Sequence, residues 1–218
     1  MENGTIVPAR HDLVRRWFVA VTIGEALGFA APASAGALTA DSAPGVIAVA
    51  LLMAGAVEGG VLGWFQARVL RGPLRDFPAR DWVAATVIGA VVGWTVGLIF
   101  LFHGERVLDW PIGIQAPMVS AGAAVMMFAL GVAQWYVLRQ WSDRAVLWIW
   151  ANAVGWISGL IAFLVVTGPL WRPGQSSVVT AVIGVFAGLV MAAVMAATTG
   201  AFLVRIVEPG HLRARYAR

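Results

Sequence analysis

The chain has no cysteine and no lysine, and charged residues make up only 12% of its 218 residues. The absence of cysteine excludes disulfides, thiolate metal sites and cysteine nucleophiles. An ordinary soluble domain has about 25% charged residues, whereas 60% of the residues here are hydrophobic. This composition excludes a soluble globular domain, a disordered chain and a nucleic-acid-binding domain. It predicts a protein whose main partner is the lipid bilayer.

Six apolar stretches reach the length of about 20 residues that a helix needs to cross a bilayer. They cover residues 17–38, 46–70, 82–102, 117–138, 146–167 and 178–204. The first is too long for a cleavable signal peptide, and Asp12, Arg15 and Arg16 lead into a span that contains Glu25. The connecting segments are short and rich in proline, glycine and charge. We therefore expect one all-α integral membrane domain over residues 1–218.

The arginines are distributed unequally between the two sides of the predicted spans. One side carries Arg10, Arg15, Arg16, Arg68, Arg71, Arg75, Arg80, Arg139, Arg144, Arg205, Arg213, Arg215 and Arg218. The other side carries only Arg106 and Arg172. The positive-inside rule therefore predicts that both termini face the cytoplasm. Tryptophans at the span ends are expected to lie in the membrane interfaces: Trp17, Trp82, Trp141 and Trp148 on the inner side, and Trp110 and Trp171 on the outer side.

An internal repeat is visible in the spans. Spans one, three and five share the pattern W-x6-G-x3-G, which begins at Trp17, Trp82 and Trp148, 65 and 66 residues apart. Spans two and four share G-x2-Q-x3-L-R around Gln66 and Gln134, and span six has Gly200 at the glutamine place. We interpret the repeat as three parallel helical hairpins, at about 17–71, 82–139 and 148–205, related by a pseudo-threefold axis along the membrane normal. The alternative is a chance match between residues that are common in membrane helices.

Small residues also recur at four-residue spacing, which lets helix backbones approach closely. The stripes are Gly55, Gly59 and Gly63; Gly89, Gly93 and Gly97; and Gly184, Gly188, Ala192, Ala196 and Gly200. We expect all three stripes to be packing surfaces in a tight bundle.

The segments 58–71 (EGGVLGWFQARVLR) and 129–139 (ALGVAQWYVLR) carry the glutamine pattern most clearly. With the tryptophan- and glycine-rich helices around them, they resemble a group of uncharacterised bacterial multi-pass membrane proteins. The resemblance covers most of spans two to five. It implies a fold and a compartment, the bacterial cytoplasmic (inner) membrane, but no activity.

Glu25 and Glu58 are the only ionisable residues well inside the predicted spans, where a charge costs about 2.5–3.5 kcal/mol on insertion scales for Arg, Lys or Asp. A rise of 1.5 Å per residue places them about 12 Å and 20 Å from the inner boundary. Because their helices are sequential neighbours, the two carboxyl groups could share one site that carries H+ or binds a small cation. Thr22 and Gln66 are further candidates for that site. The alternative is a protonated glutamate that makes one interhelical hydrogen bond.

A second polar set is predicted to be structural, joining the hairpins by hydrogen bonds. Its members are Gln134, Thr86, Asn152 and Gln66. Gln66 is equivalent to Gln134 under the repeat. No enzyme signature, metal-binding pattern or cofactor motif is present in the sequence, so we expect no catalytic residue, no metal and no cofactor. Two functions remain open: a small proton- or cation-linked transporter or channel, or a non-catalytic membrane subunit that packs against another membrane protein or a second copy of itself. A lipid-binding or lipid-moving role is a weaker third alternative.

Overall fold

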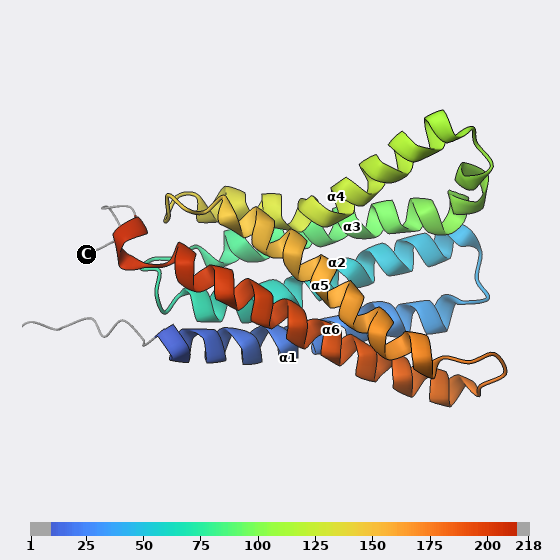
Figure 1. Ribbon diagram of the computed structural model, residues 1–218, viewed down its shortest axis with the longest axis horizontal. Helices are drawn as coiled ribbons and strands as arrows, with labels where there is room; N and C mark the ends of the chain where they lie inside the picture. Colours follow the sequence, from blue (N-terminus) through green and yellow to red (C-terminus); the bar gives the residue numbers. More distant parts are fainter. Residues whose placement is uncertain (1–9, 213–218) are drawn as a thin grey trace, which may run out of the picture.

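The computed structural model describes residues 10–212, and within them the fold is entirely helical (Figure 1). The helices are α1 (Arg10–Thr39), α2 (Pro44–Leu70), α3 (Ala79–Leu108), α4 (Ile112–Leu138), α5 (Leu147–Leu170) and α6 (Ser177–Ile206), followed by a short 3-10 turn, η1 (Pro209–His211). All six are long and apolar enough to cross a membrane. The prediction of an all-helical chain with six helices long and apolar enough to span a membrane is confirmed.

Each helix either extends beyond its predicted apolar stretch into the polar flanks or nearly coincides with it. Prolines mark the starts of several helices. Pro44 opens α2 in its first turn, where its missing N–H costs nothing, and α3 and α4 begin directly after Pro78 and Pro111. Ser176 caps α6 by accepting a hydrogen bond from the Val179 amide.

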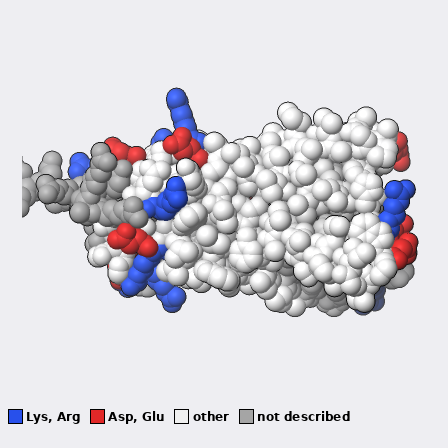
Figure 2. All heavy atoms as spheres, turned by 90° about the horizontal axis from the view of Figure 1, so that it is seen from above, with Lys and Arg blue, Asp and Glu red and all other residues white. Residues whose placement is uncertain are grey.

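The six helices form a closed ring, because each packs against the next in sequence and α6 packs against α1. We call the end where α1 begins and α6 finishes the terminal end, and the opposite end the far end. An ion pair between Arg10 and Glu208 links the two described ends of the chain. Charged side chains gather at both ends of the molecule, and the surface between them is almost free of charge (Figure 2), as a bilayer-spanning bundle requires. Arg213, Arg215 and Arg218 of the predicted cytoplasmic set lie outside the described residues.

The core occupies the terminal half of the bundle. Its largest fully buried side chains are Trp17, Trp82, Trp148, Leu70, Leu74, Leu138, Leu203 and Ile206. Toward the far end the α3–α4 hairpin diverges from α5 and α6 (Figure 1), and no residue of α4 before Gly131 is buried. The bundle is therefore tightly packed at one end and open to its surroundings at the other.

Four tryptophans expected in the inner membrane interface lie inside the protein instead. Trp17, Trp82 and Trp148 have no exposed surface, and Trp141 is 4% exposed. The rings of Trp17 and Trp148 meet edge to face with centroids 5.4 Å apart, and Trp82 contacts Trp148 at 5.8 Å. Their interface assignment was wrong because they face the ring interior, where the terminal half is dense enough to enclose an indole. At the far end, Trp110 and Trp171 are substantially exposed.

The glycine stripes are packing surfaces only in part. A Cβ on Gly59 would lie 2.8 Å from the Ala90 Cβ, and one on Gly63 would lie 2.9 Å from the Thr86 Cβ, so α2 and α3 touch through these glycines. In contrast, a Cβ on Gly93 or Gly188 would have no neighbour within 4 Å. The expectation that both of these glycines set helix contact distances was wrong, because no neighbouring side chain or backbone approaches either position.

Candidate functional site

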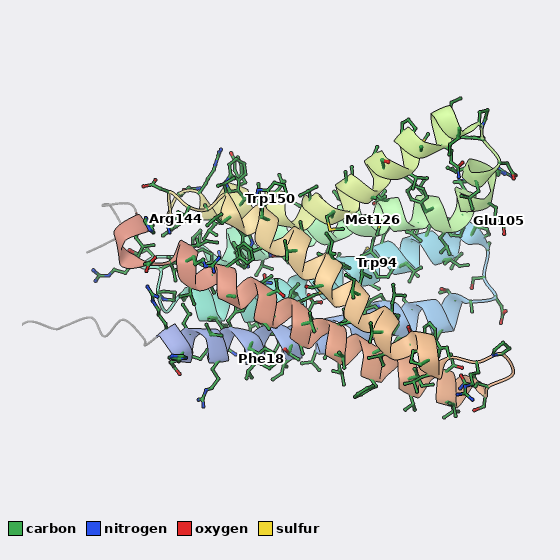
Figure 3. All side chains as sticks on the ribbon, viewed as in Figure 1. Phe18, Trp94, Glu105, Met126, Arg144 and Trp150 are labelled. Carbon is green, nitrogen blue, oxygen red and sulfur yellow. The ribbon has the colours of Figure 1, made fainter. Side chains whose placement is uncertain are left out.

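Glu58 lies near the middle of α2 and is held by a tryptophan of the next helix. The indole Nε1–H of Trp94, on α3, donates a 2.7 Å hydrogen bond to Glu58 Oε2. The ring can reach α2 because of Gly55: a Cβ at that position would lie 2.2 Å from Trp94 Cδ1. Figure 3 shows Trp94 between Arg144 at the terminal end and Glu105 at the far end. Trp94 was not among the residues singled out from the sequence.

Glu25 lies near the middle of α1, on the helix that packs against α2. One turn further along, Gly28 allows close contact with Glu58, because a Cβ on Gly28 would lie 3.1 Å from the Glu58 carbonyl oxygen. Glu25 and Glu58 are both half-buried. A Cβ on Gly28 would also lie 3.3 Å from the Glu58 Cγ. The two glutamates that were paired from the sequence thus lie on neighbouring, closely packed helices.

Neither carboxyl group has a basic partner among residues 10–212. Glu208, at the terminal end, is the acidic partner of Arg10, Arg144 and His211. Thr22, one turn before Glu25, adds a further polar group, because its hydroxyl is buried and makes no hydrogen bond within the described part of the chain. No group of three or more metal-ligating side chains occurs in the same range.

Gln66 takes part in a different cluster, deep in the terminal half. Its Oε1 accepts hydrogen bonds from Trp82 Nε1 at 3.0 Å and from Gln134 Nε2 at 2.8 Å. Gln134 also donates to the Thr86 hydroxyl at 2.9 Å and accepts from Trp148 Nε1 at 2.9 Å. Since an indole N–H can only donate, the two tryptophans fix the orientation of both amides. Gln66 lies eight residues from Glu58, about 12 Å along α2, so the structure groups it with the second polar set.

The third repeat tryptophan makes a comparable bond with a residue that the sequence analysis did not single out. Trp17 Nε1 donates to Thr199 Oγ1 at 2.9 Å, joining α1 to α6. Gly200, at the glutamine place, leaves room for this ring, because a Cβ there would lie 3.0 Å from Trp17 Cδ1. Asn152, by contrast, bonds within its own helix, to the Trp148 carbonyl oxygen at 2.9 Å.

Two open grooves flank α1 near the terminal end. One lies between α1 and α2 and measures about 480 Å³, and the other lies between α1 and α6 and measures about 620 Å³. Arginine side chains line both grooves, and neither is lined by Glu25 or Glu58. The candidate site therefore consists of Glu25, Glu58, Thr22 and Trp94, with Gln66, Gln134 and Thr86 in a separate buried network. No protein-family model, curated protein or solved structure matches this chain.

Proposed function

We propose that this chain is a multi-pass protein of the bacterial cytoplasmic membrane that carries H+ or a small cation through Glu25 and Glu58. One observation carries the proposal: two carboxyl-bearing residues near the middle of adjacent, closely packed helices have no basic partner in residues 10–212. We propose no enzymatic step and no bound cofactor or metal centre.

The energetics of the bilayer support this reading. A charge inside a membrane helix is costly, and such residues normally pair with an opposite charge or face a pathway. Without an arginine partner, two neighbouring carboxylates must gain their neutrality from a proton or a bound cation. The Trp94 N–H orients one oxygen of Glu58 and leaves the other to act as a ligand. The Thr22 hydroxyl supplies a neutral oxygen whose lone pairs could contact a cation.

Replacing either carboxyl group by its amide is expected to abolish transport. Glutamine keeps the size and the hydrogen-bonding ability of glutamate but cannot take up or release a proton. In proteoliposomes, Glu25→Gln and Glu58→Gln should reduce H+ or Na+ flux to the level of empty liposomes, while the melting temperature stays near that of wild type. Glu105→Gln is the matched control, because Glu105 is exposed at the end of α3 and lies outside the site. Equal flux in all variants, or no flux from wild-type protein, would contradict the proposal.

A second reading, a non-catalytic membrane subunit, draws support from α4. In the most apolar part of that helix only 6% of residues are buried within the chain, against 17–28% in the other five. A face of this size is covered either by lipid or by another membrane helix. If wild-type liposomes carry no ion, this second reading is preferred, with Glu25 and Glu58 as interhelical hydrogen-bonding groups.

We further propose three hairpins related by a pseudo-threefold axis, with both termini in the cytoplasm. The hydrogen bonds of the three repeat tryptophans support the repeat. Trp17, Trp82 and Trp148 each lie in the first part of an odd-numbered helix, and each donates to the preceding even-numbered helix of the ring. The sidedness rests on the arginine distribution.

Reporter fusions test the topology directly. Fusions at positions 42, 108 and 174 should report the external side, and fusions at 76, 142 and 218 the cytoplasmic side. The far-end connections would then be external and the terminal end internal. A cytoplasmic signal at 108 would overturn the proposed sidedness.

A further inference from the structure

We propose that the groove between α1 and α2 binds one anionic phospholipid, with its phosphate among Arg15, Arg16 and Arg68 and an acyl chain along the apolar part of the groove. The groove is lined by these three arginines and by Val19, Ala20, Ile23, Phe65 and Val69. No aspartate or glutamate lines it. Its charge therefore suits an anion, and a lipid with a cationic headgroup would bring its ammonium close to three guanidinium groups.

The order of residues along the helices matches the shape of a phospholipid. On α1 the two arginines are followed by Val19 one turn later and by Ile23 one turn after that, and both apolar side chains are exposed. On the antiparallel α2, Phe65 lies one turn closer to the bundle centre than Arg68. We call the apolar residues of the groove beyond the arginines the apolar lane. From Arg15 to Ile23 the groove extends about 12 Å toward the membrane centre. The headgroup of a bound phospholipid would therefore contact the arginines at the terminal end, and its acyl chain would contact the apolar lane.

Both helices contribute arginines to the lining of the groove. The guanidinium of Arg68 stacks on the ring of Trp64, with its Cζ 4.1 Å from the centroid. This stacking leaves the N–H groups at the guanidinium edge available for phosphate oxygens. Arg16 reaches across to α2, because its Nη1 lies 3.9 Å from the position of a Cβ on Gly72, just after that helix ends. None of the three arginines forms an ion pair with a residue in the range 10–212.

The α1–α2 contact forms the base of the groove. A Cβ on Gly24 would lie 3.1 Å from the Phe65 Cβ, so the two helices are closely packed beneath the apolar lane. Val69 is 5% exposed at the level of the arginines. The groove is therefore a fixed feature of a tight helix pair, and a lipid can bind it without reorganising the bundle.

Lipid titration of the purified full-length protein in a neutral detergent tests this inference, with bound lipids counted by native mass spectrometry. Wild-type protein should bind dioleoylphosphatidylglycerol at least about fivefold more tightly than dioleoylphosphatidylcholine. Arg16→Gln and Arg68→Gln should each weaken phosphatidylglycerol binding about fivefold, since a basic residue near an anionic lipid surface is worth about 1 kcal/mol. Arg80→Gln is the matched control, because Arg80 is exposed at the same end of the bundle but outside the groove.

Equal losses in Arg80→Gln and the groove variants, or no headgroup preference in the wild-type protein, would overturn the inference. Competition by excess inorganic phosphate would show that the arginines hold a free anion and not a lipid. Because all three arginines are exposed, their substitution should leave the fold intact. Arg15→Gln provides a third variant should one of the others fail to fold, and it is expected to lose the same preference.

Discussion

Gly59→Leu should destabilise the bundle by about 3 kcal/mol or more, because inserting side-chain atoms into a closely packed contact forces the backbones apart. The position leaves no room even for a methyl group. A Cβ on Gly59 would lie 2.8 Å from the Ala90 Cβ and 3.0 Å from the Thr86 carbonyl oxygen. The second of these neighbours is backbone and cannot rotate away. The measurement is the unfolding midpoint in detergent, compared with that of wild-type protein.

Gly93→Leu is the matched control for this substitution. It introduces the same side chain into the next helix, where a Cβ would meet nothing within 4 Å. Leucine also favours helix over glycine by up to about 1 kcal/mol, so this variant should unfold at or above the wild-type midpoint. If both variants lose stability equally, the α2–α3 contact at Gly59 does not limit packing.

The contrast between Gly59 and Gly93 shows where sequence reasoning about the fold reaches its limit. Span length and hydropathy are local properties, so the six helices could be predicted from the sequence, with boundaries shifted mainly by polar flanks. Both glycines belong to equally regular four-residue stripes, and the spacing alone cannot distinguish them. Whether a glycine contacts a neighbour depends on which side of its helix faces another helix at that level, and that is decided by packing between helices, not by spacing within one helix.

The repeat tryptophans show a second limit. An indole at the end of a membrane helix is stable either in the interface or in the interior with its N–H paired. The sequence placed Trp17, Trp82 and Trp148 at span ends but did not say which way they face. The repeated glutamines could have indicated that these tryptophans face the interior. An indole N–H can only donate a hydrogen bond, and the glutamine at the matching repeat position offers an amide oxygen that can accept it. Thr199 escaped notice because the repeat alignment placed Gly200, one residue later, opposite Trp17.

Glu25 and Glu58 could be singled out from the sequence because carboxyl groups are rare inside membrane helices. The sequential order of their helices also predicted that α1 and α2 pack against each other, as they do. The partner of Glu58 was not predictable in the same way. Trp94 is one of eleven tryptophans in the chain, and its contact depends on the space left by Gly55, on another helix.

Gln134→Met should lower the free energy of unfolding by about 3 kcal/mol. Methionine is similar in length and apolar, so the change removes hydrogen bonds and leaves little empty space. The Trp148 N–H would lose its acceptor inside the core, and an unsatisfied buried donor costs about 1–3 kcal/mol. The bonds from Gln134 to Gln66 and Thr86 would also be lost, and interhelical bonds of this kind contribute about 0.6 kcal/mol each on average.

Asn152→Leu distinguishes a network that joins helices from a buried amide of any kind. Asn152 is also buried, at 4% exposure, but its amide donates only to the carbonyl oxygen of Trp148 on its own helix. That oxygen lies one turn back, where a backbone N–H of α5 also reaches it, so the substitution leaves no group unpaired and should cost less than about 1 kcal/mol. Unfolding midpoints of the two variants in the same detergent give the comparison. A loss as large for Asn152→Leu as for Gln134→Met would mean that the volume of the amide matters more than its hydrogen bonds. A larger loss for Gln134→Met would instead identify the bonds between α2, α3, α4 and α5 as the main polar support of the ring's terminal half.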